Sequence, residues 1–300
     1  MPQPSPRLRM RNGMNLPRTR LCLLPLLILI SAAPVASPTM ADKTMALQEQ
    51  WKDRLAEEKL RAIAAPPFVI AGNGSADQLA AYRDGTILAA MHSLEATYFD
   101  TPPTEPIIIF LFESEGPYKR LARKWFDDKD VPHYGFYRPG DRVMFMNVGT
   151  GTGTLVHELT HALIAPDFPD VPSWFNEGLA SLYEQCSLGK DTITGHENWR
   201  LPALQKAIKA GTLRPLSELI EDPHFYREDL VGLNYAEARY LMFYLQEKGL
   251  LVRYYKEFRA AAKDDPTGLK TLQKIVAPKD KDLDAFEKEW RKWVLTLRFG

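Results

Sequence analysis

The stretch TGTLVHELTH, residues 152–161, contains the pattern H-E-x-x-H inside a run whose apolar spacing predicts a helix. Residues four apart share one face of a helix, so His157 and His161 can direct their imidazoles at one point. A single Zn²⁺ accepts two such nitrogens, and Glu158 beside them can reach a metal-bound water without being a ligand. This pattern suits metal-assisted hydrolysis of an amide, whereas its plain alternative is an exposed helix with two solvated histidines.

A strand and a hairpin are expected before this helix. Residues 106–112, PIIIFLF, are apolar on both faces, which is typical of a central strand. A hairpin is predicted from the aromatic run 133–137, the turn 138–141 and the resumed strand pattern at 142–147. The last strand before the helix is therefore expected at Val143–Met146.

A glycine-rich segment, GTGTG at residues 149–153, leads from that strand into the helix. It lacks the lysine of a phosphate-binding Walker loop and the glycine spacing of a dinucleotide fingerprint. We expect it to supply flexibility, with Thr152 or Thr154 as the helix N-cap.

A second helix should return close to the first. The first helix ends at Pro166, residues 167–172 hold two more prolines, and Ser173 can cap the helix that begins WFNEGLA. Two helices joined by a short connection tend to pack as antiparallel neighbours. Glu177, one turn into the second helix, is then available as a third metal ligand.

The expected fold class is α+β. A helix at 42–64, a short strand at Phe68–Ala71 and a helix ending near Tyr98 precede the strands already described. From Leu201 onward the pattern is all helical, with a capping-box start predicted at Asn234. We expect a small, mostly antiparallel sheet whose edge strand lies beside the H-E-x-x-H helix. Residues 42–200 would form this part, and the helical residues 201–300 would pack on it.

Charge and cysteine content narrow the possible partners. Residues 1–41 carry five arginines and no acidic residue, so the remaining chain has 33 basic and 38 acidic residues, a net charge of −5. No basic patch indicates nucleic acid as a partner. Cys186 is the only cysteine after residue 41, so no intramolecular disulfide can form there, and it is expected to be a small buried hydrophobe.

The N-terminal residues are typical of an export signal. Arginines precede an apolar run from Leu21 to Ile30, and small residues follow through Ala36. The run is short for a membrane span and holds Pro25, so we expect cleavage, with the favoured position after Ala41, rather than a retained anchor. The protein would then be exported, periplasmic or secreted, without stable membrane association.

Together the motifs HELTH at 157–161 and WFNEGLA at 174–180 resemble those of the gluzincins, the thermolysin-like zinc metallopeptidases, and most closely the peptidase MA-like group. The resemblance extends over about residues 105–250 and is sharpest at 152–184. It implies a zincin-like fold, one Zn²⁺ per chain, and a peptide or protein substrate aligned along the edge strand Val143–Met146.

The resemblance also implies roles for individual residues. His157, His161 and Glu177 would be the zinc ligands, with a fourth position left for water. Glu158 would be the general base toward that water and would then pass its proton to the leaving amine.

Two positions depart from the family pattern. Thermolysin-like enzymes often place an aspartate four residues after the glutamate ligand, where Ser181 stands here, and Glu184 is the candidate to replace it as the acceptor for a ligand histidine. The group that stabilises the oxyanion is also unassigned. Tyr235 is the first candidate, and its alternatives, together with a purely local role for each, are Tyr240, His224 and His196.

Two functions are compatible with this sequence. The first is a zinc peptidase, either endo- or exo-acting. The second is a gluzincin-like module that binds zinc and recognises peptides or a protein partner without turnover. A purely structural zinc site is disfavoured because such sites usually have four protein ligands. The sequence does not indicate the oligomeric state.

Overall fold

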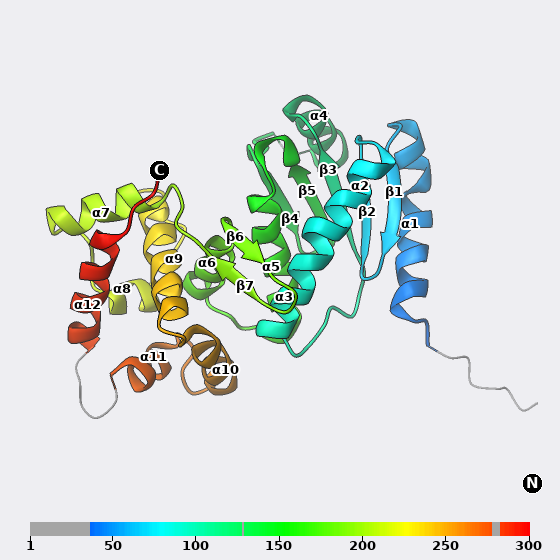
Figure 1. The fold of residues 1–300 in the computed structure, drawn as a ribbon. Coiled ribbons are helices and arrows are strands. Elements are labelled where there is room, and N and C mark those ends of the chain that lie inside the picture. The colour runs from blue at the N-terminus through cyan, green and yellow to red at the C-terminus, as the bar shows by residue number, and fades with distance from the viewer. Residues whose placement is uncertain (1–36, 128, 278–282) are drawn as a thin grey trace, which may run out of the picture. The chain divides into compact units, whose positions relative to one another are not determined.

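The computed structural model describes residues 37–127, 129–277 and 283–300 (Figure 1). The chain divides into two units, Met1–Ser37 and Pro38–Gly300, and every described helix and strand belongs to the second. The predicted export signal lies almost entirely outside the described residues. Helix α1 (Met40–Glu57) is capped by the Thr39 side chain, so the predicted cleavage point after Ala41 falls in its first turn. Within the described ranges, no helix is long and apolar enough to cross a membrane.

A mixed five-stranded sheet forms the first part of this unit. Its strands, in spatial order, are β1 (Arg61–Ala65), β2 (Phe68–Gly72), β3 (Ile107–Phe112), β5 (Val143–Asn147) and β4 (Gly135–Arg138). The pairs β2–β3 and β3–β5 are parallel, and the outer pairs β1–β2 and β4–β5 are antiparallel. The fold is α+β as expected, but the sheet is mixed rather than mostly antiparallel.

The strand that precedes the H-E-x-x-H helix is not an edge strand. β5 pairs with β3 on one side and with β4 on the other, and all five of its residues are buried. The edge beside that helix is β4, the first arm of the predicted hairpin. The expectation that Val143–Met146 would present an open edge to an extended peptide is therefore wrong.

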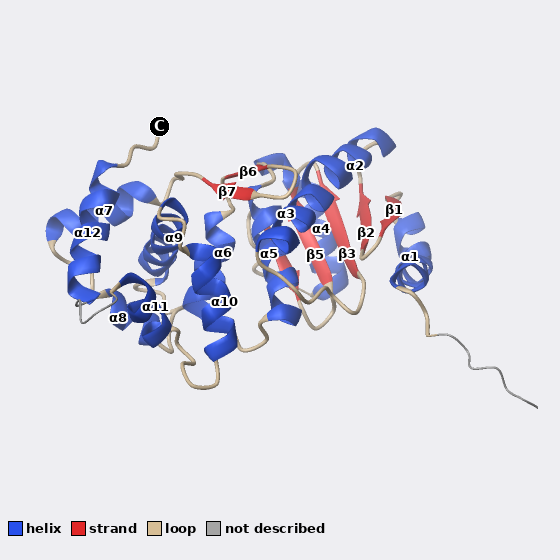
Figure 2. Cartoon of the chain, turned by 60° about the horizontal axis from the view of Figure 1, so that its bottom comes forward, coloured by secondary structure: helices blue, strands red, loops and turns tan. Residues whose placement is uncertain are grey.

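Helices cover both faces of the sheet (Figures 1 and 2). Alternate strand residues such as Phe110 and Phe145 pack with α1 and with α4 (Glu115–Phe126). Their neighbours, such as Ile109 and Met144, join the larger core that contains α3 (Ala89–Thr97) and α5 (Gly153–Asp167). A short α2 (Ala76–Tyr82) and one π-helical turn lead into α3.

After α5 the chain is mainly helical, apart from a small hairpin of β6 (Cys186–Leu188) and β7 (Ile193–Gly195) (Figure 2). The helices are α6 (Ser173–Leu182), α7 (Leu201–Ala210), α8 (Leu216–Glu221), α9 (Val231–Glu247), α10 (Leu251–Ala261), α11 (Leu269–Val276) and α12 (Leu283–Thr296). The predicted helical C-terminal half is confirmed. Asn234 does not start a helix, however, because α9 begins at Val231 and the Asn234 amide donates to the backbone oxygen of Phe225.

Helix α5 is held at both ends. A Cβ placed on Gly153 would lie 2.3 Å from the backbone oxygen of Glu184, so only glycine permits this approach. At the other end, the buried Asp167 carboxylate accepts hydrogen bonds from the Tyr255 hydroxyl, the Arg259 guanidinium and the backbone N–H groups of Asp100 and Thr101. The glycine-rich segment thus provides close packing at Gly153, where flexibility was expected.

Candidate metal centre

The two histidines come from α5 and the carboxylate comes from α6. Helix α5 ends at Asp167, one residue after Pro166, and Pro169 and Pro172 lie in the turn after which α6 packs against α5. His157 and His161 lie one turn apart on α5, and Glu177 lies in the second turn of α6. The three side chains form a group that is able to hold a metal ion.

The ligand atoms of this group form a nearly equilateral triangle. The two Nε2 atoms of His157 and His161 are 3.0 Å apart. The Oε2 atom of Glu177 lies 3.3 Å from Nε2 of His157 and 3.4 Å from Nε2 of His161. This oxygen is buried and has no hydrogen-bond donor among the described residues, which leaves a lone pair directed toward the histidines.

The protonation states of His157 and Glu177 depend on each other and on the carboxylate of Glu184. Burial alone lowers the pKa of His157, but the carboxylates of Glu177 and Glu184 outweigh it and raise the pKa to about 10. Burial raises the pKa of Glu177, and the two neighbouring histidines hold it well below its ordinary value. Without a metal, the group is therefore a histidinium–carboxylate ion pair, and a metal ion would displace the proton.

Each histidine has a neighbour at its second ring nitrogen. The Nδ1 atom of His161 lies 2.9 Å from Oδ1 of Asn176, which fixes Nδ1 as the donor and leaves Nε2 for the metal. The Nδ1 atom of His157 lies 3.5 Å from Oε1 of Glu184, an ion-pair distance rather than a hydrogen bond. Ser181 does not take this position, because its buried hydroxyl has no hydrogen-bond partner within the described ranges.

Glu184 is itself fixed from the other side. Arg200 donates to both of its carboxylate oxygens, at 3.0 and 2.7 Å, and the Asn198 amide donates at 3.0 Å. Burial raises the pKa of Glu184, but His157 and Arg200 lower it to about 2. The carboxylate is therefore ionised and immobilised beside His157, where it can hold the orientation of that ring.

Two tyrosines approach Glu177 from the direction of α9. The Tyr226 hydroxyl, in the loop before α9, donates to Oε1 of Glu177 at 2.7 Å. Tyr235, in α9, packs under the Arg200 guanidinium, whose central carbon is 4.8 Å from the ring centroid. Burial and the Glu177 carboxylate raise the pKa of both hydroxyls, so both remain protonated donors.

The alternatives to Tyr235 lie in other surroundings. The Tyr240 hydroxyl accepts from the backbone N–H of Asn198 and donates to the backbone oxygen of the same residue. His196 Nε2 lies 2.6 Å from the Ser187 hydroxyl. His224 is exposed. Tyr235 is distinguished by its position beside the site, where the charge of Glu177 contributes to its raised pKa.

Glu158 is half-buried on α5, next to His157. Its negative charge contributes to the raised pKa of Tyr137 on β4 and of Tyr226, so its carboxylate lies near both hydroxyls. The general-base candidate is thus within electrostatic range of the sheet edge and of the loop before α9.

Tyr226, Asn176, Asn198 and Arg200 were not anticipated from the sequence. Asn176 could have been identified as a site residue from the sequence, because it directly precedes Glu177 within the second motif. The other three reach the site through tertiary contacts from distant loops, and no spacing rule indicates them.

An open pocket of about 660 Å³ lies beside Glu184, and none of His157, His161 and Glu177 belongs to its lining. Its wall includes Val156, which precedes His157, together with the Glu184–Arg200 ion pair. Tyr134 and Trp199 lie at the same pocket, and both are largely exposed.

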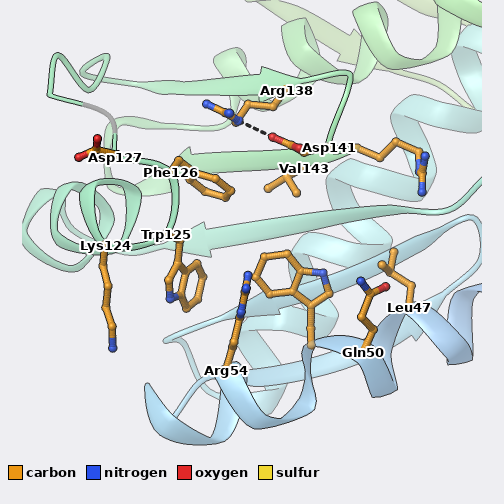
Figure 3. Close-up of a pocket in the computed structure, with 12 residues that line it drawn as sticks. Leu47, Gln50, Arg54, Lys124, Trp125, Phe126, Asp127, Arg138, Asp141 and Val143 are labelled. Carbon is orange, nitrogen blue, oxygen red and sulfur yellow. Dashed lines mark hydrogen bonds and ion pairs between the residues drawn. The ribbon is translucent and has the colours of Figure 1, made fainter.

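Another open pocket lies between α1, α4 and the β4–β5 hairpin (Figure 3). Among its charged side chains, Arg138 pairs with Asp141, and Lys124 pairs with Glu57 and Glu58. It lies at the α1–α4 face of the sheet, whereas α5 packs on the other face. This pocket is therefore separate from the metal group.

No model of a known protein family matches the chain. A search of curated proteins also finds no match.

Proposed function

We propose that this protein is an exported zinc-dependent peptidase of the gluzincin type, with His157, His161 and Glu177 as the zinc ligands. The observation that carries the proposal is the triangle of ligand atoms with sides of 3.0, 3.3 and 3.4 Å. Ligand atoms bound to tetrahedral zinc at about 2.0–2.1 Å lie about 3.3 Å from one another. The unsatisfied Oε2 of Glu177 and the orientation of His161 by Asn176 also fit such an ion.

When bound, zinc supplies a Lewis acid that acidifies a water molecule and polarises the scissile carbonyl. The chain supplies the remaining functions. Glu158 accepts a proton from the attacking water and delivers it to the departing amine. Glu184, held by Arg200, keeps the His157 ring oriented.

The hydroxyl groups of Tyr226 and Tyr235 are the donors available to a developing oxyanion. Tyr235 remains our first choice, because it is the more buried of the two and packs against Arg200. The β4 edge, rather than β5, is the strand at which an extended peptide could add to the sheet.

The test is zinc analysis of the purified protein together with a peptide-library digest of wild type and Glu158→Gln. We expect one zinc per chain in both proteins, cleavage by wild type, and loss of cleavage in Glu158→Gln. Protein that carries no zinc and is unaffected by chelators would refute the proposal. Stoichiometric zinc without cleavage of any peptide would instead favour a binding module without turnover.

A further inference from the structure

The pocket between α1, α4 and the β4–β5 hairpin, here called the α1–α4 pocket, has more basic than acidic residues in its lining (Figure 3). Its volume of about 620 Å³ lies within the ordinary range for ligand pockets, about 300–1,000 Å³. The described part of its lining contains four basic residues and two acidic ones, namely Arg54, Lys124, Arg138 and Arg142 against Asp127 and Asp141. The chain after residue 41 has a net charge of −5, so this local excess of basic residues departs from the composition of the protein.

Two of these basic side chains have no carboxylate partner. Arg138 and Lys124 pair with neighbouring carboxylates. Arg54 and Arg142 form neither an ion pair nor a side-chain hydrogen bond with any residue that the structure describes. A guanidinium without such a partner keeps its N–H donors available to the oxygens of a bound anion.

Arg54 is held at the pocket by an aromatic ring. Its guanidinium carbon lies 5.0 Å from the centroid of the Trp51 ring. Trp51 is itself fixed, because it is buried and its ring makes edge contacts with Phe110 at 5.1 Å and with Trp125 at 5.6 Å. A guanidinium above a ring face keeps the N–H groups at its edge free. The contact therefore positions Arg54 without using its donors.

Arg142 stands on a fixed turn, at a backbone position where an arginine is unusual. Its φ is +53°, in the left-handed region that favours glycine or asparagine. Its backbone N–H donates to the oxygen of Pro139 at 3.2 Å, and its backbone oxygen accepts from the N–H of Ile108 at 3.0 Å. The turn therefore holds the Arg142 backbone in place while the side chain lines the pocket with its donors unused.

The remaining lining residues describe the rest of a ligand. Trp125 and Phe126, at the end of α4, line the pocket and are half-buried, so part of each ring is available to an apolar group. Asp127 is exposed and forms no ion pair among the described residues, so its charge opposes an anion. Removal of that charge should therefore strengthen the binding of an anion.

We propose that the α1–α4 pocket binds a small organic anion, whose carboxylate or phosphate group pairs with Arg54 and Arg142 and whose apolar body packs on Trp125 and Phe126. Guanidinium groups bind these oxyanions through charge-assisted hydrogen bonds. The pocket lies on the face of the sheet opposite α5, so this binding depends neither on the metal group nor on the proposed peptidase function.

The first test measures binding by isothermal titration calorimetry. Phenyl phosphate and phenylacetate are the anionic probes, and benzyl alcohol is the neutral probe. We expect the full chain to bind at least one of the two anions and not to bind benzyl alcohol measurably. Arg54→Gln and Arg142→Gly should each raise the Kd of the bound anion by about tenfold, because each removes a charge-assisted contact. Glycine is chosen at position 142 because it adopts the left-handed backbone freely.

Arg123→Gln is the matched control, because Arg123 is an exposed arginine on α4 that does not line this pocket. It should leave the Kd as in wild type, whereas Asp127→Asn should lower the Kd by about two- to threefold. Wild type that binds neither anion overturns the proposal. Equal losses in Arg123→Gln and in the two pocket variants, or binding that survives both pocket changes, would also overturn it.

The second test locates the bound anion by the indole N–H signals of the tryptophans in ¹⁵N-labelled protein, assigned by single Trp→Phe changes. We expect phenyl phosphate to shift the signals of Trp51 and Trp125, which line the pocket, and to leave that of Trp174 unchanged, because Trp174 is buried in α6. Trp199 lines the pocket beside Glu184. A shift of the Trp199 signal without shifts of Trp51 and Trp125 would place the anion there and overturn the proposal.

Discussion

Tyr226 and Tyr235 present two hydroxyl groups to one carboxylate, and this arrangement separates two roles. Tyr226 donates to Oε1 of Glu177, the oxygen that does not face the histidines. That contact orients the ligand carboxylate. Tyr235 is further buried and packs against Arg200, and its hydroxyl is the donor that we propose for the oxyanion.

We predict that Tyr235→Phe lowers kcat by about 10²–10³-fold, with zinc content and KM nearly unchanged, because oxyanion donors act in the transition state. Tyr226→Phe should instead weaken zinc binding by about tenfold, because it removes a contact to a ligand. Steady-state kinetics and zinc competition with a chelator distinguish these effects.

Tyr244→Phe is the control for this pair, because it removes a hydroxyl that donates to Glu289 in the helical half. It should change neither kcat nor zinc affinity. If the kinetic loss occurs in Tyr226→Phe and not in Tyr235→Phe, the two roles are reversed.

Local periodicity explains why the metal group could be predicted from the sequence. The four-residue spacing of His157 and His161 is a property of any helix, and the prolines after α5 predicted the return that brings Glu177 close. Arg200 and Tyr226 are separated from the motifs by loops whose paths depend on the packing of the whole helical half. Their contributions could not be derived from spacing.

Helix α5 and the turn after α6 are coupled through a backbone contact. The α carbon of Gly153 lies so close to the Glu184 carbonyl that no side chain fits between them. The same Glu184 carboxylate lies beside His157, one turn further along α5. The position of this turn thus sets the distance between His157 and Glu184.

We predict that Gly153→Ala separates α5 from this turn, lowers the free energy of unfolding by about 1–3 kcal/mol and weakens zinc binding. Denaturant unfolding and zinc competition measure the two effects. The control is Gly232→Ala in α9, where a Cβ meets no atom within 4 Å. There alanine should stabilise the helix by about 0.5–1 kcal/mol. Equal behaviour of the two variants would show that the contact with Glu184 has no effect.

The sheet shows where element-level prediction failed. The apolar run in β3 correctly indicated a central strand, because burial on both faces is visible in composition. Composition does not indicate which strands are neighbours in the sheet, so β5 was assigned to the edge that β4 occupies. β1 was included in the preceding helix because its sequence, RAIAA, is rich in alanine and carries little strand signal.

A buried carboxyl group in the helical half affects the stability of the whole unit. Glu237 on α9 is fully buried, neither of its oxygens has a hydrogen-bond partner in the described part of the chain, and Arg214 Nε lies 3.9 Å away. Burial raises the pKa of Glu237 from 4.5 to about 8. The folded protein therefore keeps this proton at a pH where the unfolded chain has lost it.

Because the pKa of Glu237 is higher in the folded protein than in the unfolded chain, this group makes the protein less stable as the pH rises. Stability from this group is fully present below about pH 4.5 and is lost as the pH rises to about 8. We predict that Glu237→Gln, which stays neutral, is more stable than wild type by about 4–5 kcal/mol near pH 8.5 and differs little near pH 4.5. Denaturant unfolding of both proteins at the two pH values measures this difference.

Glu247→Gln is the matched control, because this glutamate is exposed on the same helix. It should leave the pH dependence of unfolding as in wild type. If the stabilities of wild type and Glu237→Gln change in parallel with pH, Glu237 does not have a raised pKa in the folded protein.

The fixation of α5 at Gly153 and Asp167 has a consequence for how an ion would enter and leave. Both imidazoles are oriented by a helix that is anchored independently of any metal, so little conformational entropy would be lost when an ion binds. A zinc finger, in contrast, folds only with its metal. Ion exchange would then take place within a folded protein. The supply of metal in the surrounding compartment would determine what fraction of molecules carries an ion, and not what fraction is folded.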